Sequence, residues 1–398
     1  MRPCAGAVAI VALSLLPCTP ARCLPAPNVS ASVKLALQRD LQAYLHTRGA
    51  AEHVSALSLA VSSRPDQPTI AVTAGTTRYG AGRPLRPSDL FQIGSNTKAF
   101  TAVAVLQLEA RGRLSIDAPI GEYLSQYPAY AKLTLRQLLS MTGGIESYDN
   151  TPAWEHAYAS DPMANESADQ LIRFVYPKFR SKPGTQYWYS NTGYLLAQEV
   201  VAARSESKSF EAEIARIVAS VGLKNTYYTS TLYPRPVAQR VVAGYYEMND
   251  PGFEKYIGKD VSGFSLSWAQ GAGSMVSTPQ DLTQWARALY RGTSLLPAKQ
   301  KAELMSLVST TTGQPMADVT ASDAAGFGLG VAKRYTPQFG AFWFYQGETI
   351  GFRAAHLYFP KSGLVVAVFA NSRTIEKESR LPQLFATIAA TLKKYHIA

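Results

Sequence analysis

The residues of this chain best suited to catalysis are Ser95 and Lys98, three positions apart at the start of an apolar run. A serine hydroxyl is a weak nucleophile until a base takes its proton, and three residues of α-helix rise ~4.5 Å and leave both side chains on one face. The apolar residues 99–106 predict that this helix is buried with Lys98 inside. Burial disfavours the ammonium form and lowers the pKa of a lysine, as a lysine acting as base requires.

A second Ser-x-x-Lys pair, Ser205 and Lys208, serves as an internal control. It lies in a charged stretch with no apolar run after it, which predicts a solvated serine and a charged lysine at the surface. For the first pair an ordinary structural interpretation also exists, in which Ser95 caps the helix and Lys98 lies one turn inside it. Other parts of the chain have to decide between these interpretations.

The tripeptide Tyr189-Ser190-Asn191 follows a Pro-Gly turn and precedes a run with helical spacing, which predicts a loop at a helix entrance. A tyrosine beside Ser95 and Lys98 could accept or relay the serine proton, provided that the lysine depresses the tyrosine pKa. The Asn191 amide offers both a donor and an acceptor to a substrate amide. A similar tripeptide, Tyr148-Asp149-Asn150, lacks the Pro-Gly lead-in, and we predict that it forms a polar turn.

A third stretch, Tyr345-Gln346-Gly347-Glu348, follows a strand-like run. A glycine on an edge strand lets a substrate approach the backbone. The next N–H group, that of Glu348, could then complete an oxyanion hole with the N–H group of Ser95. The alternative interpretation of Gly347 is a glycine bulge in a packed strand.

These three stretches, in this order, resemble the class C β-lactamase and DD-peptidase superfamily with its esterase and D-aminopeptidase relatives; Ser-x-x-Lys is the nucleophile motif of serine β-lactamases and penicillin-binding proteins. The resemblance runs from about residue 41 to the C-terminus, with further matches at residues 91–94, 138–144, 271–274, 277–282, 326–330 and 351–353. It implies that Ser95 is the acylated nucleophile and that Lys98 and Tyr189 share the role of base. It also implies that Asn191 contacts the substrate and that the N–H groups of Ser95 and Glu348 form the oxyanion hole.

One position departs from the pattern of this superfamily. Its lactamases and peptidases usually begin the third motif with lysine or histidine, whereas this chain has Tyr345, and esterase-like relatives can carry an aromatic residue there. A neutral phenol cannot offer the cation that helps to bind a substrate carboxylate. Arg353 could supply that charge, or it could be a strand-surface residue. The candidate substrate-binding residues are therefore Asn191, Tyr345, Gly347 and Arg353.

Other chemistries find little support. The chain has no Gly-x-Ser-x-Gly nucleophile elbow and no phosphate-loop or dinucleotide glycine pattern, so we predict no cofactor. The five histidines are isolated, without a His-x-x-x-His pair, which argues against a metal site. All three cysteines fall before residue 24, which excludes cysteine catalysis and disulfides in the body of the chain.

Residues 1–26 read as a signal peptide, in which Arg2 precedes an apolar stretch too short to span a bilayer. This predicts an exported, periplasmic or secreted protein with no transmembrane span. Lipid attachment at Cys18 or Cys23 is an alternative, although the residues before each are poor matches to such a site. The formal net charge of +11 is spread along the chain without a nucleic-acid patch, and an exported basic protein could meet anionic cell-envelope polymers.

Strand-like runs at both ends of the chain flank a region rich in helical patterns. We expect strands at residues 54–62, 69–77, 327–332, 342–345, 352–359 and 364–370. Apolar spacing predicts helices at residues 33–46, 95–112, 193–203, 279–290 and 381–395. This order predicts an α/β (α+β) fold, with an antiparallel sheet of N- and C-terminal strands flanked by helices and a largely helical inserted subdomain. One domain would span 27–398, with an α/β part at 27–114 and 301–398 and a mainly helical part at 115–300.

The predicted function is that of an exported serine hydrolase that acts through a Ser95 acyl-enzyme on an ester, amide or peptide bond, similar to a β-lactamase or D-Ala-D-Ala carboxypeptidase. A carboxylesterase for neutral hydrophobic esters, favoured by Tyr345, is one alternative. A penicillin-binding sensor or scaffold that is acylated slowly and never turns over is another, although Ser95, Lys98 and Tyr189 together favour an enzyme.

Overall fold

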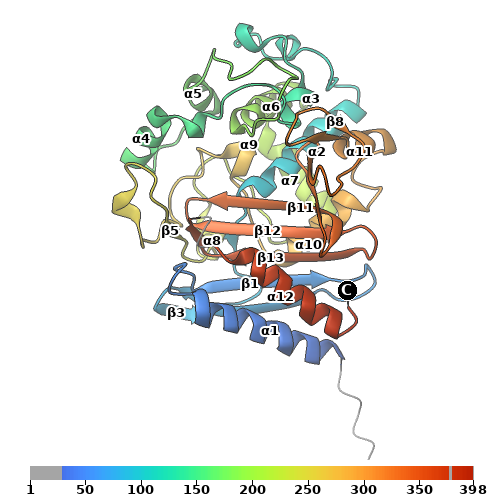
Figure 1. Cartoon of the computed structure of the whole chain (residues 1–398). Helices are drawn as coiled ribbons and strands as arrows, with labels where there is room; N and C mark the ends of the chain where they lie inside the picture. Colours follow the sequence, from blue (N-terminus) through green and yellow to red (C-terminus); the bar gives the residue numbers. More distant parts are fainter. Residues whose placement is uncertain (1–28, 376–378, 398) are drawn as a thin grey trace, which may run out of the picture.

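A ten-stranded antiparallel sheet forms the centre of the computed structural model, which describes residues 29–375 and 379–397 (Figure 1). The strands lie in the order β3-β2-β1-β13-β12-β11-β10-β9-β7-β8, so the two ends of the chain meet where β1 pairs with β13. Their bounds are β1 Ala56–Ser62, β2 Ile70–Arg78, β3 Ala81–Pro84, β7 Leu307–Ser309, β8 Pro315–Met316, β9 Ala325–Phe327, β10 Ala332–Thr336, β11 Gly340–Thr349, β12 Phe352–Phe359 and β13 Leu364–Ala370. Two short pairs lie outside this sheet: β4 Phe91–Gln92 with β6 Val276–Ser277, and β5 Tyr245–Glu247 with β14 Ser372–Thr374.

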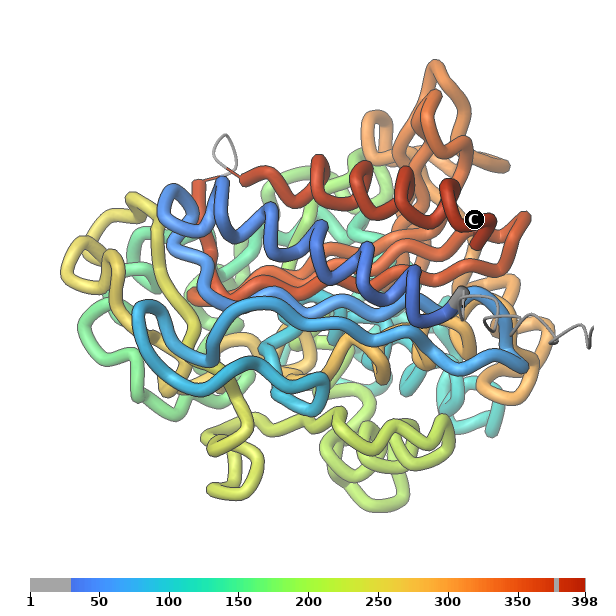
Figure 2. Tube along the Cα trace, turned by 90° about the horizontal axis from the view of Figure 1, so that it is seen from below, coloured from blue at the N-terminus to red at the C-terminus, as the bar shows by residue number. Residues whose placement is uncertain are grey.

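Helices cover both faces of the sheet. One face carries α1, Val29–Arg48, and α12, Leu381–Lys394, which run side by side across the strands in the view from below (Figure 2). Most other helices lie on the opposite side in Figure 1. Their bounds are α2 Thr97–Ala110, α3 Leu135–Leu139, α4 Pro152–Ser160, α5 Ala168–Arg173, α6 Asn191–Arg204, α7 Phe210–Val221, α8 Arg235–Ala238, α9 Gln270–Gly273, α10 Pro279–Tyr290 and α11 Ala298–Leu304.

The two layers of helices explain why the central strand β13 is apolar without interruption. Every residue of β13 is buried, because alternate side chains meet α1 and α12 on one face and α10 on the other. A strand covered on one face only would alternate apolar and polar residues. The run Leu364–Ala370 therefore already indicates a strand buried on both sides.

The central helix of the layer opposite α1 and α12 is α2. Its first ten residues, from Thr97 onward, are all buried, and the helix contacts α6, α7, α9 and α11. A helix that is apolar on every side has to be surrounded by other elements, as the run after Ser95 predicts. A 3₁₀ turn, η1 Gly94–Asn96, leads directly into α2. This turn carries Ser95 at the junction between the sheet and the helical layer.

The fold class predicted from the sequence is confirmed, and β13 and α10 have the predicted bounds. The strand expected at residues 327–332 is wrong, because residues 328–331 connect β9 to β10 and Gly330 adopts a φ of +74° there. The division into the parts 27–114 plus 301–398 and 115–300 stays a prediction. The leader at residues 1–26, with Cys18 and Cys23, lies outside the described residues. In the described part of the chain, no helix is both long and apolar enough to cross a membrane.

Candidate active site

Three side chains predicted from the sequence meet at one oxygen atom. Lys98 Nζ donates a hydrogen bond to Ser95 Oγ at 3.1 Å, and Tyr189 Oη donates another at 2.6 Å. Ser95 comes from the η1 turn, Lys98 from the first turn of α2, and Tyr189 from the loop before α6. The serine therefore faces both a candidate base and a candidate proton relay, an arrangement suited to nucleophilic catalysis.

The surroundings of Lys98 favour its neutral form. The side chain is fully buried, and Nζ donates to the carbonyl oxygen of Ala272 at 2.8 Å. Burial lowers the pKa of Lys98 from 10.5 to about 7, while the negative charge of Asp149 acts in the opposite direction. Near pH 7 about half of the molecules hold Lys98 as a free amine, which is the form that can accept a proton.

The expected depression of the Tyr189 pKa is not found. Burial raises the pKa of Tyr189 above its ordinary value, although the hydrogen bond with Ser95 lowers it in part. Lys98 Nζ lies 4.8 Å from the centre of the Tyr189 ring, but at the high pH needed to ionise a phenol Lys98 is a neutral amine, which cannot stabilise a phenolate. Tyr189 therefore keeps its proton, which leaves Lys98 as the better candidate for the base.

The control pair at Ser205 differs from the sequence expectation in one respect. Ser205 is buried rather than solvated, because it ends α6 and its hydroxyl faces the carbonyl oxygen of Ala202 and the hydroxyl of Ser207. Lys208 is exposed and donates to the carbonyl oxygen of Ala203 at 2.7 Å. The Lys208 amine is thus directed to the backbone and not to Ser205, so this pair lacks the geometry of an activated serine.

One edge of β11 is free beside Ser95. Its pairing with β10 ends at Phe344, and within the described chain no strand pairs with residues 345–349 on that side. The η1 turn lies against this edge: a Cβ atom on Gly347 would be 2.0 Å from the Ile93 carbonyl oxygen and 2.7 Å from the Ser95 nitrogen. Only glycine allows the strand and the turn to come so close.

The contact is equally close from the side of the turn. A Cβ atom on Gly94, which has a φ of +49°, would be 2.6 Å from the Glu348 nitrogen. The register between β11 and β12 runs without a shift through Gly347, so this glycine is not a bulge. The backbone nitrogens of Ser95 and Glu348 therefore lie near one another, as two donors to one oxyanion must.

Asn191 lies at the entrance of α6 and faces a residue from the tripeptide that we predicted to form a polar turn. Its Nδ2 donates to Asp149 Oδ2 at 2.6 Å, whereas its buried Oδ1 accepts no hydrogen bond from residues 29–375 or 379–397. The prediction of a polar turn is wrong for Tyr148, which is fully buried and donates to the Trp268 carbonyl oxygen. Asp149 is thus brought to the site by the packing of Tyr148.

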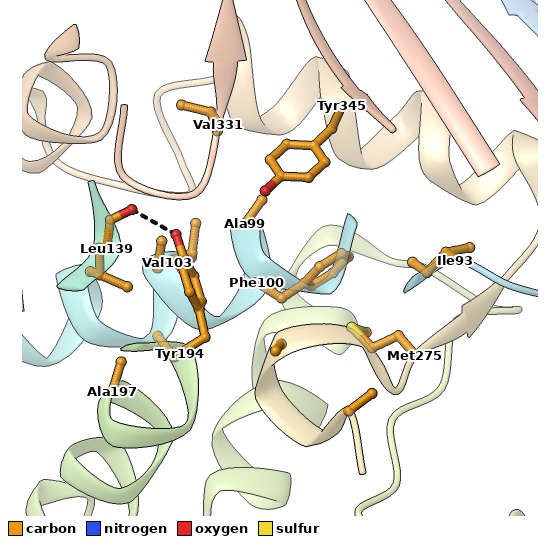
Figure 3. Close-up of a cluster of buried hydrophobic side chains, with 14 of the residues drawn as sticks. Ile93, Ala99, Phe100, Val103, Leu139, Tyr194, Ala197, Met275, Val331 and Tyr345 are labelled. Atoms are coloured by element: carbon orange, nitrogen blue, oxygen red, sulfur yellow. Dashed lines mark hydrogen bonds between the residues drawn. The ribbon is translucent and has the colours of Figure 1, made fainter. Parts of the chain in front are cut away.

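Tyr345 places an aromatic ring at the position where lactamases and peptidases of the superfamily usually carry a cation. The ring is buried in an apolar cluster above Ala99 of α2, and its hydroxyl points toward that helix (Figure 3). Burial and the neighbouring tyrosines, Tyr189 among them, raise the pKa of this hydroxyl well above the ordinary value. Tyr345 therefore stays neutral and adds apolar contact beside Tyr189.

Arg353 does not replace the missing cation, so that prediction is corrected. The pleat of β12 turns its side chain to the face covered by α1 and α12, where it is 1% exposed. Its guanidinium pairs with Glu52 at 2.9 Å and donates to the carbonyl oxygen of Ser372 at 2.7 Å. A guanidinium neutralised by a buried carboxylate on the far face of the sheet cannot bind a substrate carboxylate at Ser95.

Ser95 and Tyr189 open onto a cavity of about 570 Å³. Its wall is aromatic and acidic: four carboxylates face two guanidiniums, although the whole chain has a net charge of +11. The aromatic residues are Trp154, Tyr189, Phe253, Trp268 and Phe344, the acidic ones Asp149, Glu155, Asp250 and Glu348, and the basic ones Arg334 and Arg373. A second cavity of about 410 Å³ shares Tyr189, Arg334, Phe344 and Gln346 with the first and is lined by Tyr345 and Lys333 among others.

The sequence model of the family called Beta-lactamase matches residues 39–389. The chain belongs to the β-lactamase family. Penicillin-binding protein 4* of Bacillus subtilis is 26% identical over 229 residues, which cover 55% of this chain and 49% of that protein. Protein flp of Staphylococcus aureus strain N315 is 24% identical over 338 residues, which cover 78% of this chain and 60% of that protein. The chain thus spans only about half to three fifths of the length of these curated relatives.

Solved structures agree with this membership. A D-stereospecific amidohydrolase from Streptomyces sp. is 25% identical with a TM-score of 0.69, covering 85% of this chain and 94% of its own. The D-amino acid amidase from Ochrobactrum anthropi SV3, solved with D-phenylalanine, is 23% identical with a TM-score of 0.74, covering 91% and 99%, and shows the shared fold. The β-lactamase family is one of serine hydrolases acting on amide or ester bonds, which is the enzyme class predicted from the sequence.

Several charged residues at the cavity of this β-lactamase family member were missed by the sequence analysis. Asp149 had a signal, since it follows the matched residues 138–144, but without a Pro-Gly lead-in its tripeptide resembles a plain turn. Glu155, Asp250 and Arg373 had none, because they come from α4, from the loop after β5 and from β14. Only the folded chain brings these segments together.

Proposed function

We propose that this member of the β-lactamase family hydrolyses a small amide or ester through an acyl-enzyme on Ser95. The observation that carries the proposal is the pair of contacts at Ser95 Oγ, with the buried amine of Lys98 at 3.1 Å and with Tyr189 Oη at 2.6 Å. A lysine with a pKa of about 7 can take the serine proton at neutral pH.

The proposed reaction needs one mobile proton. Lys98 Nζ takes it from Ser95 Oγ as this oxygen attacks the substrate carbonyl carbon, and the N–H groups of Ser95 and Glu348 stabilise the negative oxygen. The buried ammonium then returns the proton to the leaving nitrogen or oxygen through Tyr189 Oη. In the second half of the reaction, water attacks the acyl carbonyl carbon and gives a proton to Lys98 Nζ. Tyr189 Oη then passes a proton to Ser95 Oγ as the acid product leaves, which restores the serine.

The two cavities suggest where each half of the substrate lies. Glu348, which offers one oxyanion donor, lines the larger cavity, so the acyl group belongs there. Tyr345 lines the smaller cavity beside the proposed proton relay Tyr189, so the leaving group belongs there. A smaller cavity of about 410 Å³ has room for a leaving group much larger than ammonia, given that one water takes up about 30 Å³ of liquid.

We further propose that the acyl group carries a primary amine. Burial and the charges of Asp250 and Asp149 raise the pKa of Glu155 even though Asp250 also pairs with Arg373 at 3.4 Å, so negative charge outweighs positive charge around Glu155. A bound ammonium group would relieve that repulsion, and the unpartnered Oδ1 of Asn191 could accept from it. The aromatic wall and the structural similarity to an amidase solved with D-phenylalanine support an acyl group of aromatic amino-acid type.

A substrate pair tests both parts of this proposal. Phenylalanine nitrophenyl esters and nitroanilides of either configuration would be compared with their N-acetyl analogues, which lack the positive charge. We expect an initial burst of nitrophenol, and kcat/KM higher by about tenfold or more for the free amine. Glu155→Gln should shrink that ratio while leaving the burst in place. Absence of a covalent adduct on Ser95 in an active enzyme would contradict the acyl-enzyme, and equal kcat/KM values would contradict amine selection alone.

The alternative functions make different predictions in the same assay. A carboxylesterase for neutral hydrophobic esters, which the apolar Tyr345 favours, would prefer the N-acetyl or simple alkyl esters. A penicillin-binding sensor would give one burst and no steady-state turnover. Penicillin and D-Ala-D-Ala peptides belong in the panel too, because both carry a carboxylate for which Tyr345 offers no cation.

Export remains part of the proposal. The leader at residues 1–26 would direct the chain to the periplasm or the medium, where the acyl-enzyme chemistry would take place. We also propose that the net positive charge of the chain lets it bind anionic cell-envelope polymers. Fractionation of expressing cells, with N-terminal sequencing of the mature chain, tests the first point, and retention on an anionic polysaccharide column at low but not at high salt tests the second.

A further inference from the structure

A chain of buried hydrogen bonds runs behind the nucleophile. The side-chain Nδ2 of Asn96 donates to the carbonyl oxygen of Ile93 at 2.8 Å and to that of Ala354 in β12 at 3.0 Å. Its Oδ1 lies 2.9 Å from His356 Nδ1, and His356 Nε2 lies 3.2 Å from the hydroxyl of Tyr290 in α10. One side chain next to Ser95 is thus tied to both the sheet and a helix beyond it.

The two carbonyl oxygens bonded to Asn96 fix which group donates in each of these hydrogen bonds. Because the Asn96 Nδ2 group donates to two carbonyl oxygens, its Oδ1 has to accept, so His356 Nδ1 is the donor. His356 Nε2 is then an acceptor and the Tyr290 hydroxyl its donor. Burial lowers the pKa of His356 to about 3, which keeps the ring in this neutral form at any pH where the enzyme would act.

We propose that Asn96 and His356 are positioning residues, which hold the Ser95 N–H group in register with the N–H group of Glu348. The inference rests on the proposed acyl-enzyme function and extends it to residues that touch no substrate. Asn96 and His356 are each only 1% exposed, and neither lines the cavity at Ser95.

The geometry explains why this position needs a polar tether. Gly347 and Gly94 leave no side chains between the η1 turn and β11, so little interdigitation prevents the turn from sliding along the strand. A Cβ on Gly347 would come within 2.8 Å of Asn96 Nδ2, which means that the amide occupies the space the glycine leaves free. Hydrogen bonds have fixed lengths and directions, so they determine the turn's position more sharply than apolar contact.

The test uses Asn96→Ala and His356→Phe in the full-length enzyme, with a nitrophenyl ester as substrate. A misplaced nucleophile and oxyanion donor should lower kcat by about 10- to 100-fold while KM changes by less than about threefold. The infrared carbonyl frequency of a ¹³C-labelled acyl-enzyme should rise, because weaker oxyanion-hole hydrogen bonds polarise the carbonyl less. His356→Gln, which can still donate to Asn96, should recover part of both values.

A matched control separates positioning from stability. Thr226 is also buried, and its hydroxyl bonds with the Asp281 and Ser277 side chains at 3.0 Å and 2.8 Å, while the residue lines neither cavity of the site. Thr226→Val should lower the melting temperature without moving kcat or the carbonyl frequency. If Asn96→Ala behaves like this control, or if His356→Gln recovers nothing, the positioning role is refuted. Failure of the wild type to form any acyl-enzyme would instead refute the proposed function itself.

Discussion

The burial of Lys98 makes a quantitative prediction about stability. Lowering its pKa from 10.5 to about 7 corresponds to about 5 kcal/mol, at about 1.4 kcal/mol per pKa unit. Below pH 7 the folded protein carries this cost in full, because the lysine is charged in both states. Between about pH 7 and pH 10.5 the unfolded chain binds a proton that the folded chain lacks, so this term makes the protein more stable as the pH rises. Above pH 10.5 the cost is absent.

Lys98→Met removes this cost together with the hydrogen bonds to Ala272 and Ser95. Those bonds contribute about 1–3 kcal/mol, independent of pH in this range to a first approximation. We therefore expect the variant to be about 2–4 kcal/mol more stable than wild type at pH 6.5 and less stable at pH 10.5. The variant should also lose about 10²- to 10⁴-fold in kcat.

Urea unfolding followed by tryptophan fluorescence, at several pH values from 6.5 to 10.5, measures this difference. At each pH the free energy of unfolding of the variant is subtracted from that of wild type. This stability difference should change by about 5 kcal/mol between pH 6.5 and pH 10.5. The acylation rate of wild type with a nitrophenyl ester should rise through a pKa near 7 and then level off. A stability difference that does not change with pH would refute a buried neutral Lys98, and so would an acylation rate that rises only above pH 9.

Four further substitutions test other parts of the site. Tyr189→Phe should lower kcat by about 10²-fold or more with little change in KM, because it removes the proton relay and not a binding contact, as stopped-flow kinetics can show. Gly347→Ala should abolish acylation, since its Cβ would overlap the Ile93 carbonyl oxygen, and mass spectrometry of the trapped enzyme checks this. Tyr345→His should shift the ratio of kcat/KM values toward carboxylate-bearing substrates such as penicillins. Arg353→Met should leave that ratio unchanged but destabilise the fold by about 3–5 kcal/mol in denaturant titrations, because it strands a buried carboxylate.

The sequence by itself determined the parts of this protein that depend on local spacing. The position of Lys98 one turn after Ser95, inside a helix apolar on every side, follows from residues 95–106 alone, because a helix of that composition must be buried. β13 could be predicted with correct bounds for the same reason, as a continuous apolar run of strand length. Residue type and local spacing therefore predict the candidate pair Ser95 and Lys98 and a sheet built from the two ends of the chain, whereas the ordered set of motifs was needed to favour catalysis over a simple helix cap.

Only the tertiary structure decided which side chains reach the cavity. Arg353 is the second residue of β12, just after the turn that connects it to β11. The pleat and register nevertheless direct its side chain to Glu52 and away from Ser95. Asp149 comes to the site because Tyr148 beside it is buried, and the Tyr189 pKa rises because burial outweighs its hydrogen bond with Ser95. Strand register, burial and the charge of a neighbour arise from contacts between distant segments, and local sequence spacing holds no information about those contacts.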